Sequence, residues 1–257
     1  MCLILLSYHQ HPKYPVVIAA NRDEFYERPT LPARFWPEDP KVLAGKDLQG
    51  GGTWLGISKK GRSAMITNYR EPETFDPKAP TRGKLVSDFL CGSEPALKYL
   101  ERIRSGASDY NGFNLILGDD SGIYYFSNRA ADIKKMSTGL YGLSNALLDT
   151  PWPKVSKSKI ALAAILNEPE LNEEALFKIL LDTERAQDER LPDTGVGTAL
   201  EKILSPAFIK SPKYGTRCST VVLIDSNSRV RFIERSYDPG SDRWKEVRYD
   251  FKWAGRL

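Results

Sequence analysis

The chain opens with two apolar runs, Cys2-Leu3-Ile4-Leu5-Leu6-Ser7-Tyr8 and Pro15-Val16-Val17-Ile18-Ala19-Ala20. The segment between them, residues 9–14, is polar and contains a proline. Short apolar runs joined by a polar turn are typical of adjacent strands that are buried on both faces. The sequence therefore predicts an N-terminal β-hairpin inside the protein.

The pattern changes after this hairpin. Residues 21–44 are rich in charge and interrupted by prolines, so we expect a long excursion with little regular structure. A second hairpin is predicted from residues 51–58 and 63–69, which flank the glycine turn Lys59-Lys60-Gly61.

The middle of the chain has helical periodicity. Two short helices are expected after Thr81 and Ser93, each of which is predicted to act as an N-cap, and Asn172 is predicted to cap a later one. The remaining expected helices are residues 153–166 and 198–204, separated by a polar loop at 183–197. Further strands are expected at 113–117, 123–127, 141–146, 218–224, 229–234 and 246–251.

This order of elements predicts an α+β protein with strands first and last and helices in between. Neither an internal repeat nor a linker-like composition break divides the sequence. We therefore expect a single domain over residues 1–257.

Composition excludes several classes of protein. Of the 257 residues, 41% are hydrophobic and 27% charged, which is typical of a globular protein and not of a disordered or collagen-like chain. A net charge of +4, with no basic tract, gives no reason to expect a nucleic-acid partner. No apolar run approaches the roughly 20 residues of a membrane span. Three cysteines without a short spacing favour a reducing, cytoplasmic location and predict neither a disulfide framework nor a metal site.

Cys2 is the first candidate for chemistry. Removal of Met1 makes it the N-terminal residue, and its free α-amine then titrates near about 7.7–8.0, which suits a base for its own thiol. Nucleophile and base would be one residue, as in N-terminal-threonine enzymes. The alternative is that Cys2 is a small hydrophobic residue that opens a buried strand.

The polar segment Asn21-Arg22-Asp23-Glu24 ends the strand that is predicted to pair with the one that Cys2 opens. These two ends are adjacent in an antiparallel hairpin. Asp23 could hold the α-amine, and Arg22 could stabilise a thiolate or bind a carboxylate. Equally, the segment could form only a surface ion pair.

Three further residues lie at strand ends. Asn68 and Asn145 are candidates to donate hydrogen bonds to an oxyanion, although asparagine also commonly satisfies backbone groups in turns. Arg217 opens a late strand and could be a ligand clamp or an ordinary surface charge.

Several motifs resemble the NRDE family, whose animal members are called transport and Golgi organisation protein 2. The matching segments run from residue 2 to about residue 225, and AANRDEF and YGLSNALLDTPW are the most specific of them. They are MCLILL, AANRDEFYERP, GGTWLGIS, ITNYREP, NGFNLI, YGLSNALLDTPWPK, YGTRCST and VVLID.

The resemblance implies an N-terminal-nucleophile hydrolase type of fold, a four-layer αββα sandwich of mainly antiparallel sheets. It implies a thiol amidohydrolase or thioesterase in which Cys2 is the nucleophile and Asp23 the carboxylate near its amine. Asn68 and Asn145 become the oxyanion donors, and Arg217 lines the site. Related amidases carry an arginine just before the Asn-x-Asp motif, where this chain has Ala20, and its arginine is Arg22 instead.

The resemblance also implies a non-catalytic alternative, a haem-trafficking chaperone or a carrier of acyl lipid or acyl-CoA. No cofactor is required, and haem would be cargo. His9 and His11, the two histidines, lie together in the predicted turn. We expect a small hydrophobic or acylated ligand, and aromatic residues such as Trp36 and Trp152 could line its cavity. The predicted ligand-binding residues are Asn21, Arg22, Glu24, Trp54 and Tyr69.

Overall fold

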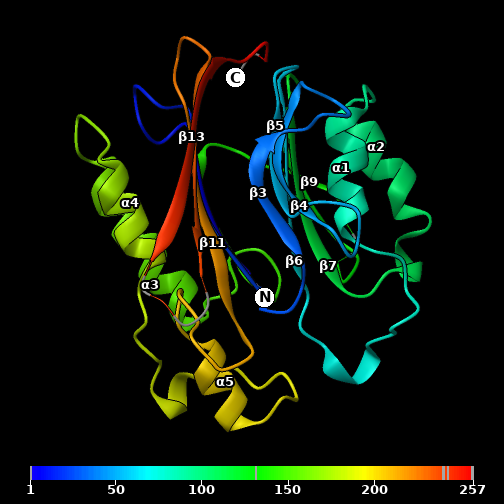
Figure 1. Ribbon diagram of the computed structural model, residues 1–257, viewed down its shortest axis with the longest axis vertical. Coiled ribbons are helices and arrows are strands. Elements are labelled where there is room, and N and C mark those ends of the chain that lie inside the picture. Colours follow the sequence, from blue (N-terminus) through cyan, green and yellow to red (C-terminus); the bar gives the residue numbers. More distant parts are fainter. Residues whose placement is uncertain (1, 131, 239–240, 242, 256–257) are drawn as a thin grey trace.

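A computed structural model describes residues 2–130, 132–238, 241 and 243–255. Two antiparallel β-sheets lie face to face, and helices cover the outer face of each sheet (Figure 1). The layers therefore follow the order helix, sheet, sheet, helix, which confirms the αββα arrangement and the α+β class.

One sheet has six strands in the order β10-β1-β2-β11-β12-β13. The predicted N-terminal hairpin, β1 and β2, lies inside this sheet, between β10 and β11. The strands are β1 (Cys2–Tyr8), β2 (Val16–Phe25), β10 (Gly139–Leu143), β11 (Tyr214–Ile224), β12 (Arg229–Tyr237) and β13 (Trp244–Lys252).

The other sheet has seven strands, which follow one another in chain order. It contains the predicted second hairpin, β5 and β6. The strands are β3 (Thr30–Phe35), β4 (Val42–Asp47), β5 (Leu55–Ser58), β6 (Arg62–Asn68), β7 (Phe113–Asp119), β8 (Gly122–Ser127) and β9 (Lys134–Lys135).

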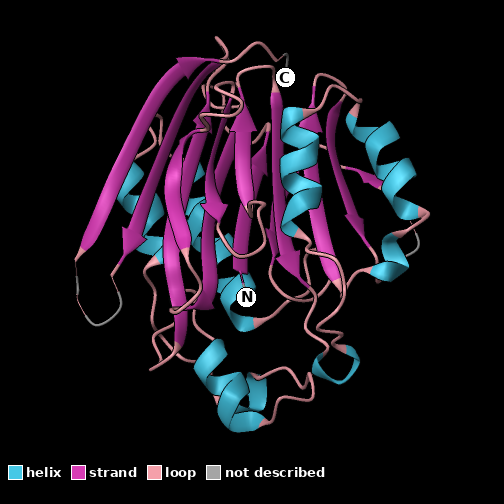
Figure 2. Cartoon of the chain, turned by 45° about the vertical axis from the view of Figure 1, so that its right-hand side comes forward, coloured by secondary structure: helices cyan, strands magenta, loops and turns pink. Residues whose placement is uncertain are grey.

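Helices α1 and α2 pack on the seven-stranded sheet, and α3 and α4 pack on the six-stranded sheet (Figure 2). Helix α5 lies at one end of the sandwich (Figure 1). The helices are α1 (Gly83–Cys91), α2 (Ala96–Arg104), α3 (Pro153–Leu166), α4 (Glu173–Leu180) and α5 (Thr198–Leu204), with short 3₁₀ turns at Pro72–Thr74, Ala107–Asp109 and Asp188–Arg190.

Strand β1 shows why the two N-terminal runs of the sequence are apolar at nearly every position. Ile4 and Leu6 belong to the core between the two sheets, whereas Leu3 and Leu5 belong to the core under α3 and α4. Successive side chains of a strand point to opposite faces, so a strand covered on both sides needs apolar residues at every position.

The prediction that residues 21–44 have little regular structure was wrong. Strand β2 continues to Phe25, and β3 and β4 follow. Strand β3 was not predicted because it contains Pro32, which has no backbone N–H. The strand lies at the edge of its sheet, where a missing backbone donor is tolerated. The pairing of β3 with β4 shifts between Leu31 and Arg34, on either side of the proline.

Two of the three predicted N-caps were also wrong. Helix α1 is preceded by Arg82 and α2 by Pro95, and neither residue caps the helix with its side chain. The first N–H of α2 instead donates to the carboxylate of Asp119, which lies far away in sequence. Asn172 does cap α4, and its Oδ1 accepts from the two backbone N–H groups of Glu174 and Ala175.

Among the described helices, none combines the length and the apolar character that a membrane crossing needs.

Candidate functional site

The register of β1 and β2 brings the segment 21–24 to the start of the chain. Cys2 pairs directly with Arg22. On the other side of β2, Arg22 pairs with Cys218 and Asp23 with Thr216, across a register shift in β11. The predicted proximity of Cys2 to this segment is therefore present in the fold.

A cavity of about 420 Å³ opens at this end of the sandwich, and we call it the Cys2 cavity. Its wall includes residues of both sheets and of the segment 75–83, which leads into α1. Six of the ten predicted site residues line it: Cys2, Arg22, Asp23, Glu24, Trp54 and Asn68.

Cys2 is half-buried and belongs to the lining of the Cys2 cavity. Burial raises the pKa of its thiol, because an ionised sulfur loses hydration there. Its backbone carbonyl accepts a hydrogen bond from the Ser144 hydroxyl (2.9 Å), which fixes the start of β1 against the segment after β10. The thiol thus needs nearby positive charge to become a nucleophile at neutral pH.

Arg22 supplies such a charge. Its guanidinium is buried, stacks over the ring of Trp54 at 4.3 Å, and donates to the Thr30 hydroxyl (3.2 Å). The nearest carboxylate oxygen, on Glu24, is 4.0 Å away. The stack and the hydrogen bond hold the guanidinium in one orientation while leaving donors toward the cavity.

Asp23 is buried at the edge of the same cavity. Its Oδ1 accepts from the Thr216 hydroxyl (2.6 Å), and its backbone carbonyl accepts from the Tyr214 hydroxyl (2.9 Å). Burial raises the pKa of this carboxyl, whereas the positive charge of the chain's N-terminus, Lys154, the Thr216 hydroxyl and Arg22 lower it. The charge of Asp23 therefore depends on the cations around it.

Glu24 belongs to an ion-pair group at the mouth. Its carboxylate lies 3.8 Å from Nε of Arg28, which forms a bidentate contact with Asp47 (2.7 and 3.2 Å). Hydrogen bonding to Arg28 and to the Gly50 N–H overcomes burial and lowers the pKa of Asp47. The Asp47 carboxylate therefore stays ionised at neutral pH.

The two predicted oxyanion donors differ. Asn68 lines the Cys2 cavity, and its carboxamide has no hydrogen-bond partner among the described residues. Asn145 is buried outside the lining, donates to the backbone carbonyl of Asn68 (2.8 Å) and accepts from Ser144 (3.3 Å). Asn68 is thus available to a ligand, and Asn145 positions it.

Three further predicted residues lie outside the lining of the Cys2 cavity. Asn21 points to the helix layer and donates to the carbonyls of Leu180 (2.7 Å) and Ala207 (2.8 Å). Arg217 donates to the carbonyls of Phe25 (2.8 Å) and Arg28 (3.0 Å) and so braces the turn between β2 and β3.

Tyr69 is the third. It follows β6, packs beside Gly112 and donates its backbone N–H to that residue's carbonyl (2.9 Å). Tyr69 comes directly after Asn68, which ends β6, and it is not among the residues that line the Cys2 cavity.

Sequence reasoning missed the basic residues at the mouth, Arg28 and Arg82. Both lie in the cavity lining, and Arg82 donates to the carbonyl of Gly112 (2.9 Å). Phe75, at 60% exposure, lies on the same wall. Arg28 lies inside the recognised segment AANRDEFYERP, whereas Arg82 lies ten residues beyond ITNYREP, where no motif marked it.

The histidines lie away from this site. Cys2 begins β1 and the turn that holds the histidines follows the end of this strand, a span of about 20 Å at the rise of a strand. The His11 ring is buried, contacts the Glu168 carbonyl (3.0 Å) and accepts from the Lys13 N–H (3.1 Å). His11 organises its own turn.

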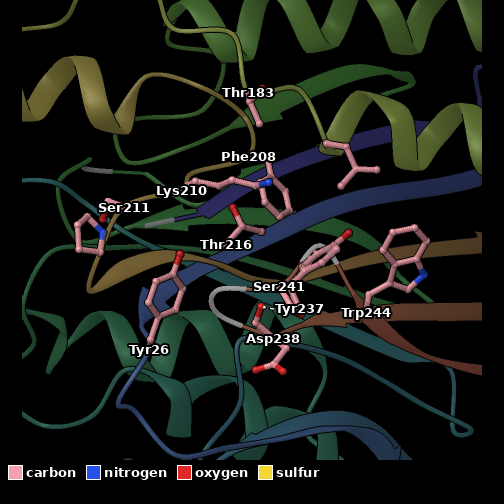
Figure 3. Close-up of a pocket in the computed structure, with 12 residues that line it drawn as sticks. Tyr26, Thr183, Phe208, Lys210, Ser211, Thr216, Tyr237, Asp238, Ser241 and Trp244 are labelled. Carbon is pink, nitrogen blue, oxygen red and sulfur yellow. Dashed lines mark hydrogen bonds between the residues drawn. The ribbon is translucent and has the colours of Figure 1, made fainter.

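A second cavity of about 730 Å³ is lined in part by residues of β11, β12 and β13, and Figure 3 shows its lining residues. Its aromatic residues are Tyr26, Phe208, Tyr237 and Trp244. Thr216 belongs to its lining and also donates to Asp23, so one residue borders this cavity and contacts the Cys2 site. Within the described residues, no three His, Cys, Asp or Glu side chains converge as metal ligands.

Comparisons with known proteins place this geometry in context. The model of the family described as "Transport and Golgi organisation 2" matches residues 1–239. The "Transport and Golgi organization protein 2 homolog" of Homo sapiens is 38% identical over 273 residues, which cover 98% of this chain and 99% of that protein.

Two solved structures are similar in fold. A Caenorhabditis elegans N-acylethanolamine-hydrolyzing acid amidase ortholog superposes with a TM-score of 0.50 at 11% identity, covering 86% of this chain and 92% of the other. A variant of the conjugated bile acid hydrolase from Clostridium perfringens gives a TM-score of 0.51 at 9% identity, covering 98% and 97%. These similarities confirm the N-terminal-nucleophile hydrolase type of fold.

Proposed function

The chain belongs to the Transport and Golgi organisation 2 family, and on that premise we propose that it is a thiol hydrolase of amide or thioester bonds with Cys2 as its nucleophile. One observation carries the proposal: Cys2 pairs with Arg22 and lines a cavity together with Asp23 and Asn68. These are the residue types that a self-activated N-terminal thiol needs around it.

The reaction begins once Met1, which lies outside the described residues, has been removed. The α-amine of Cys2 takes the thiol proton, and the thiolate attacks the carbonyl carbon of the substrate. The Asn68 carboxamide donates to the developing oxyanion. Collapse of the tetrahedral intermediate expels the amine or thiol leaving group, which receives the proton from the α-ammonium. Water then hydrolyses the acyl–sulfur bond with the amine as general base.

The cavity supports a ligand with an acyl part and a polar part. Trp54 and Ile66 supply apolar surface near Cys2, and Arg22 and Arg82 supply donors for a carboxylate or phosphate. We therefore propose an acylated small molecule as substrate.

The alternative proposal is a carrier for haem, acyl lipid or acyl-CoA. One observation favours it: the Asn145 carboxamide, predicted to complete the oxyanion site, is already bonded to Asn68 and Ser144. If the cargo is haem, the Cys2 thiolate is the predicted axial ligand of its iron at the cavity. The two histidines lie at the other end of β1.

The first experiment measures intact mass and then acylation by a thioester probe. We expect loss of Met1, a covalent acyl adduct on Cys2, and at least about a hundredfold loss of probe turnover in Cys2→Ser. Cys91→Ser, which removes an exposed thiol, is the matched control and keeps full turnover. Retention of Met1 in protein from its natural source contradicts the hydrolase proposal.

A haem titration separates the two proposals. The carrier requires a Soret shift at stoichiometric haem that is lost in Cys2→Ala and kept in His11→Ala. An unchanged spectrum, together with an acyl adduct on Cys2, contradicts the carrier proposal and supports the hydrolase proposal.

A further inference from the structure

A buried hydrogen-bond network joins the start of β1 to the opposite sheet. It runs through residues 144–148, which follow β10 and which we call the bridge segment. The polar side chains of this network are almost inaccessible: Ser144 is 3% exposed, Asn145 and Thr67 are 1% exposed, and Asn114 is 0% exposed. Buried polar groups need hydrogen-bond partners, so the partners of the bridge segment show what it holds in place.

Two side chains of the seven-stranded sheet hold the first part of the bridge segment. The Thr67 hydroxyl donates to the carbonyl of Ser144 (2.6 Å), and the Asn114 carboxamide donates to the carbonyl of Ala146 (2.9 Å). Asn114 also donates to the Thr67 hydroxyl (3.1 Å), which therefore accepts as well as donates. A hydroxyl that is used in both directions has one orientation, so Thr67 and Asn114 act as a unit.

Two backbone N–H groups complete this attachment. The N–H of Arg70 donates to the carbonyl of Asn145 (2.8 Å). The N–H of Leu148 donates to the Tyr125 hydroxyl (3.1 Å), and this hydroxyl donates to the carboxamide oxygen of Asn114 (2.8 Å). Residues of β6, β7 and β8 thus bind the bridge segment, although it follows a strand of the other sheet.

The side chains of the bridge segment bind both parts of the candidate site. Ser144 Oγ donates to the carbonyl of Cys2 (2.9 Å), and Asn145 Nδ2 donates to the carbonyl of Asn68 (2.8 Å). Among the described residues, the pairing of β1 with β10 covers only Ile4 to Tyr8. The Ser144 hydroxyl therefore continues the attachment of β1 on this side to the residue that carries the thiol.

The spacing between these two bonds is short. Ser144 and Asn145 are neighbours in the chain, so one residue of backbone connects the group that holds Cys2 to the group that holds Asn68. In the proposed reaction these two residues supply the nucleophile and the oxyanion donor. A displacement of about 1 Å between reacting groups can cost on the order of a hundredfold in rate.

We propose that Ser144 and Thr67 are positioning residues of the Cys2 site. Through the bridge segment they hold the backbones of Cys2 and Asn68 in one fixed relation, so that the thiol and the carboxamide can act on the same carbonyl group. The use made of that relation rests on the proposed function. Neither Ser144 nor Thr67 belongs to the described lining of the Cys2 cavity, so both act through residues that do.

Steady-state kinetics with the thioester probe test this role. Ser144→Ala removes the bond to Cys2, and Thr67→Val removes the bond to the bridge segment while keeping the shape of the side chain. Each variant should lower kcat at least about tenfold and leave KM within about twofold, because the nucleophile is displaced while the cavity still binds the probe. Ser144→Thr and Thr67→Ser keep the hydroxyl and restore kcat.

A double variant tests whether the two residues act through the same segment. The kcat of Ser144→Ala/Thr67→Val should match that of the slower single variant, because the second substitution affects a segment that the first has already released. Ser205→Ala is the matched control. It removes a buried hydroxyl that donates to the carbonyl of Lys202 (2.9 Å) at the end of α5, and it should leave kcat and KM unchanged.

Hydrogen exchange tests the network without any substrate. In Thr67→Val, the N–H groups of Arg70 and Leu148 should exchange at least about tenfold faster relative to the amides of β12, because the bridge segment opens locally. If Thr67→Val does not fold, Tyr125→Phe takes its place, since it removes the acceptor of the Leu148 N–H and the donor to Asn114.

A wild-type kcat in both Ser144→Ala and Thr67→Val overturns the inference, and so does unchanged exchange of Arg70 and Leu148. Losses that multiply in the double variant contradict action through one segment. The outcome for the proposed function is separate. Failure of the probe to acylate Cys2 in the wild-type protein contradicts the hydrolase proposal, and hydrogen exchange then decides the role of the network. Acylation with an unchanged kcat in both variants supports the hydrolase and contradicts the positioning role.

Discussion

Neighbouring residues of the segment 21–24 face different layers of the molecule. Asn21 makes buried hydrogen bonds to the helix layer, and the Asp23 carboxylate accepts a hydrogen bond from Thr216. Arg22 turns the other way, toward Trp54 and the Cys2 cavity. One strand end therefore holds two layers together and also builds a site, because side chains alternate along β2.

Asn21 should show the largest effect of the four on stability. Asn21→Ala leaves the carbonyls of Leu180 and Ala207 without their buried donor, and we expect a loss of about 2–4 kcal/mol in unfolding free energy. Urea unfolding measures it. Asn227→Ala, in an exposed turn, is the control and should change little. Equal effects of the two variants would mean that Asn21 does not tie the layers together.

Arg22 should matter less for stability and more for binding. Arg22→Met removes the stack on Trp54 and the contact with Thr30, and we expect a loss of about 1–2 kcal/mol. Calorimetry should also show weaker binding of an anionic acyl ligand. Arg34→Met removes an exposed arginine from β3 and serves as the control. Unchanged ligand affinity in Arg22→Met would show that Arg22 does not bind the ligand.

Asp23 should change how stability depends on pH. Burial raises its folded pKa above 3.8, so in the interval above 3.8 the folded protein holds a proton that the unfolded chain has lost. This group therefore lowers the unfolding free energy as pH rises through that interval. Asp23→Asn removes the contribution, so its stability relative to wild type should rise with pH there. Urea titrations from acid to neutral pH test the sign, and a falling difference contradicts it.

Glu24 should have the smallest effect. Its carboxylate is partly exposed and lies 3.8–4.0 Å from Arg28 and Arg22. Glu24→Gln should change the unfolding free energy by no more than about 0.5 kcal/mol, and added salt should reduce the difference further. A loss as large as that of Asn21→Ala would show that the mouth of the cavity is part of the stable core.

Much of the fold could be predicted from local patterns. The spacing of apolar residues gave α3 and α5 with their observed ends, and the Asn172 cap marked the start of α4. The sequence did not predict strands β3 and β4, because their segment is rich in prolines and charged residues. Such residues are tolerated in strands at or near a sheet edge, where some backbone groups form no ladder hydrogen bonds.

The candidate site was predictable to the extent that it depends on pairing within one hairpin. Cys2 and Arg22 are brought together by a short turn, and the apolar runs fix their register. Arg82 reaches the same region from the start of α1, and no local pattern in the sequence indicates that approach.

The sequence by itself determined the continuous apolar runs that bury β1 and β2 on both faces, and with them the pairing of Cys2 with the segment 21–24. Only the tertiary structure decided which of those residues face a cavity, and that Asn145 supports Asn68 instead of reaching the cavity itself. The reason is physical: hairpin register follows from neighbouring residues, whereas burial and charge compensation depend on segments that pack from distant parts of the chain.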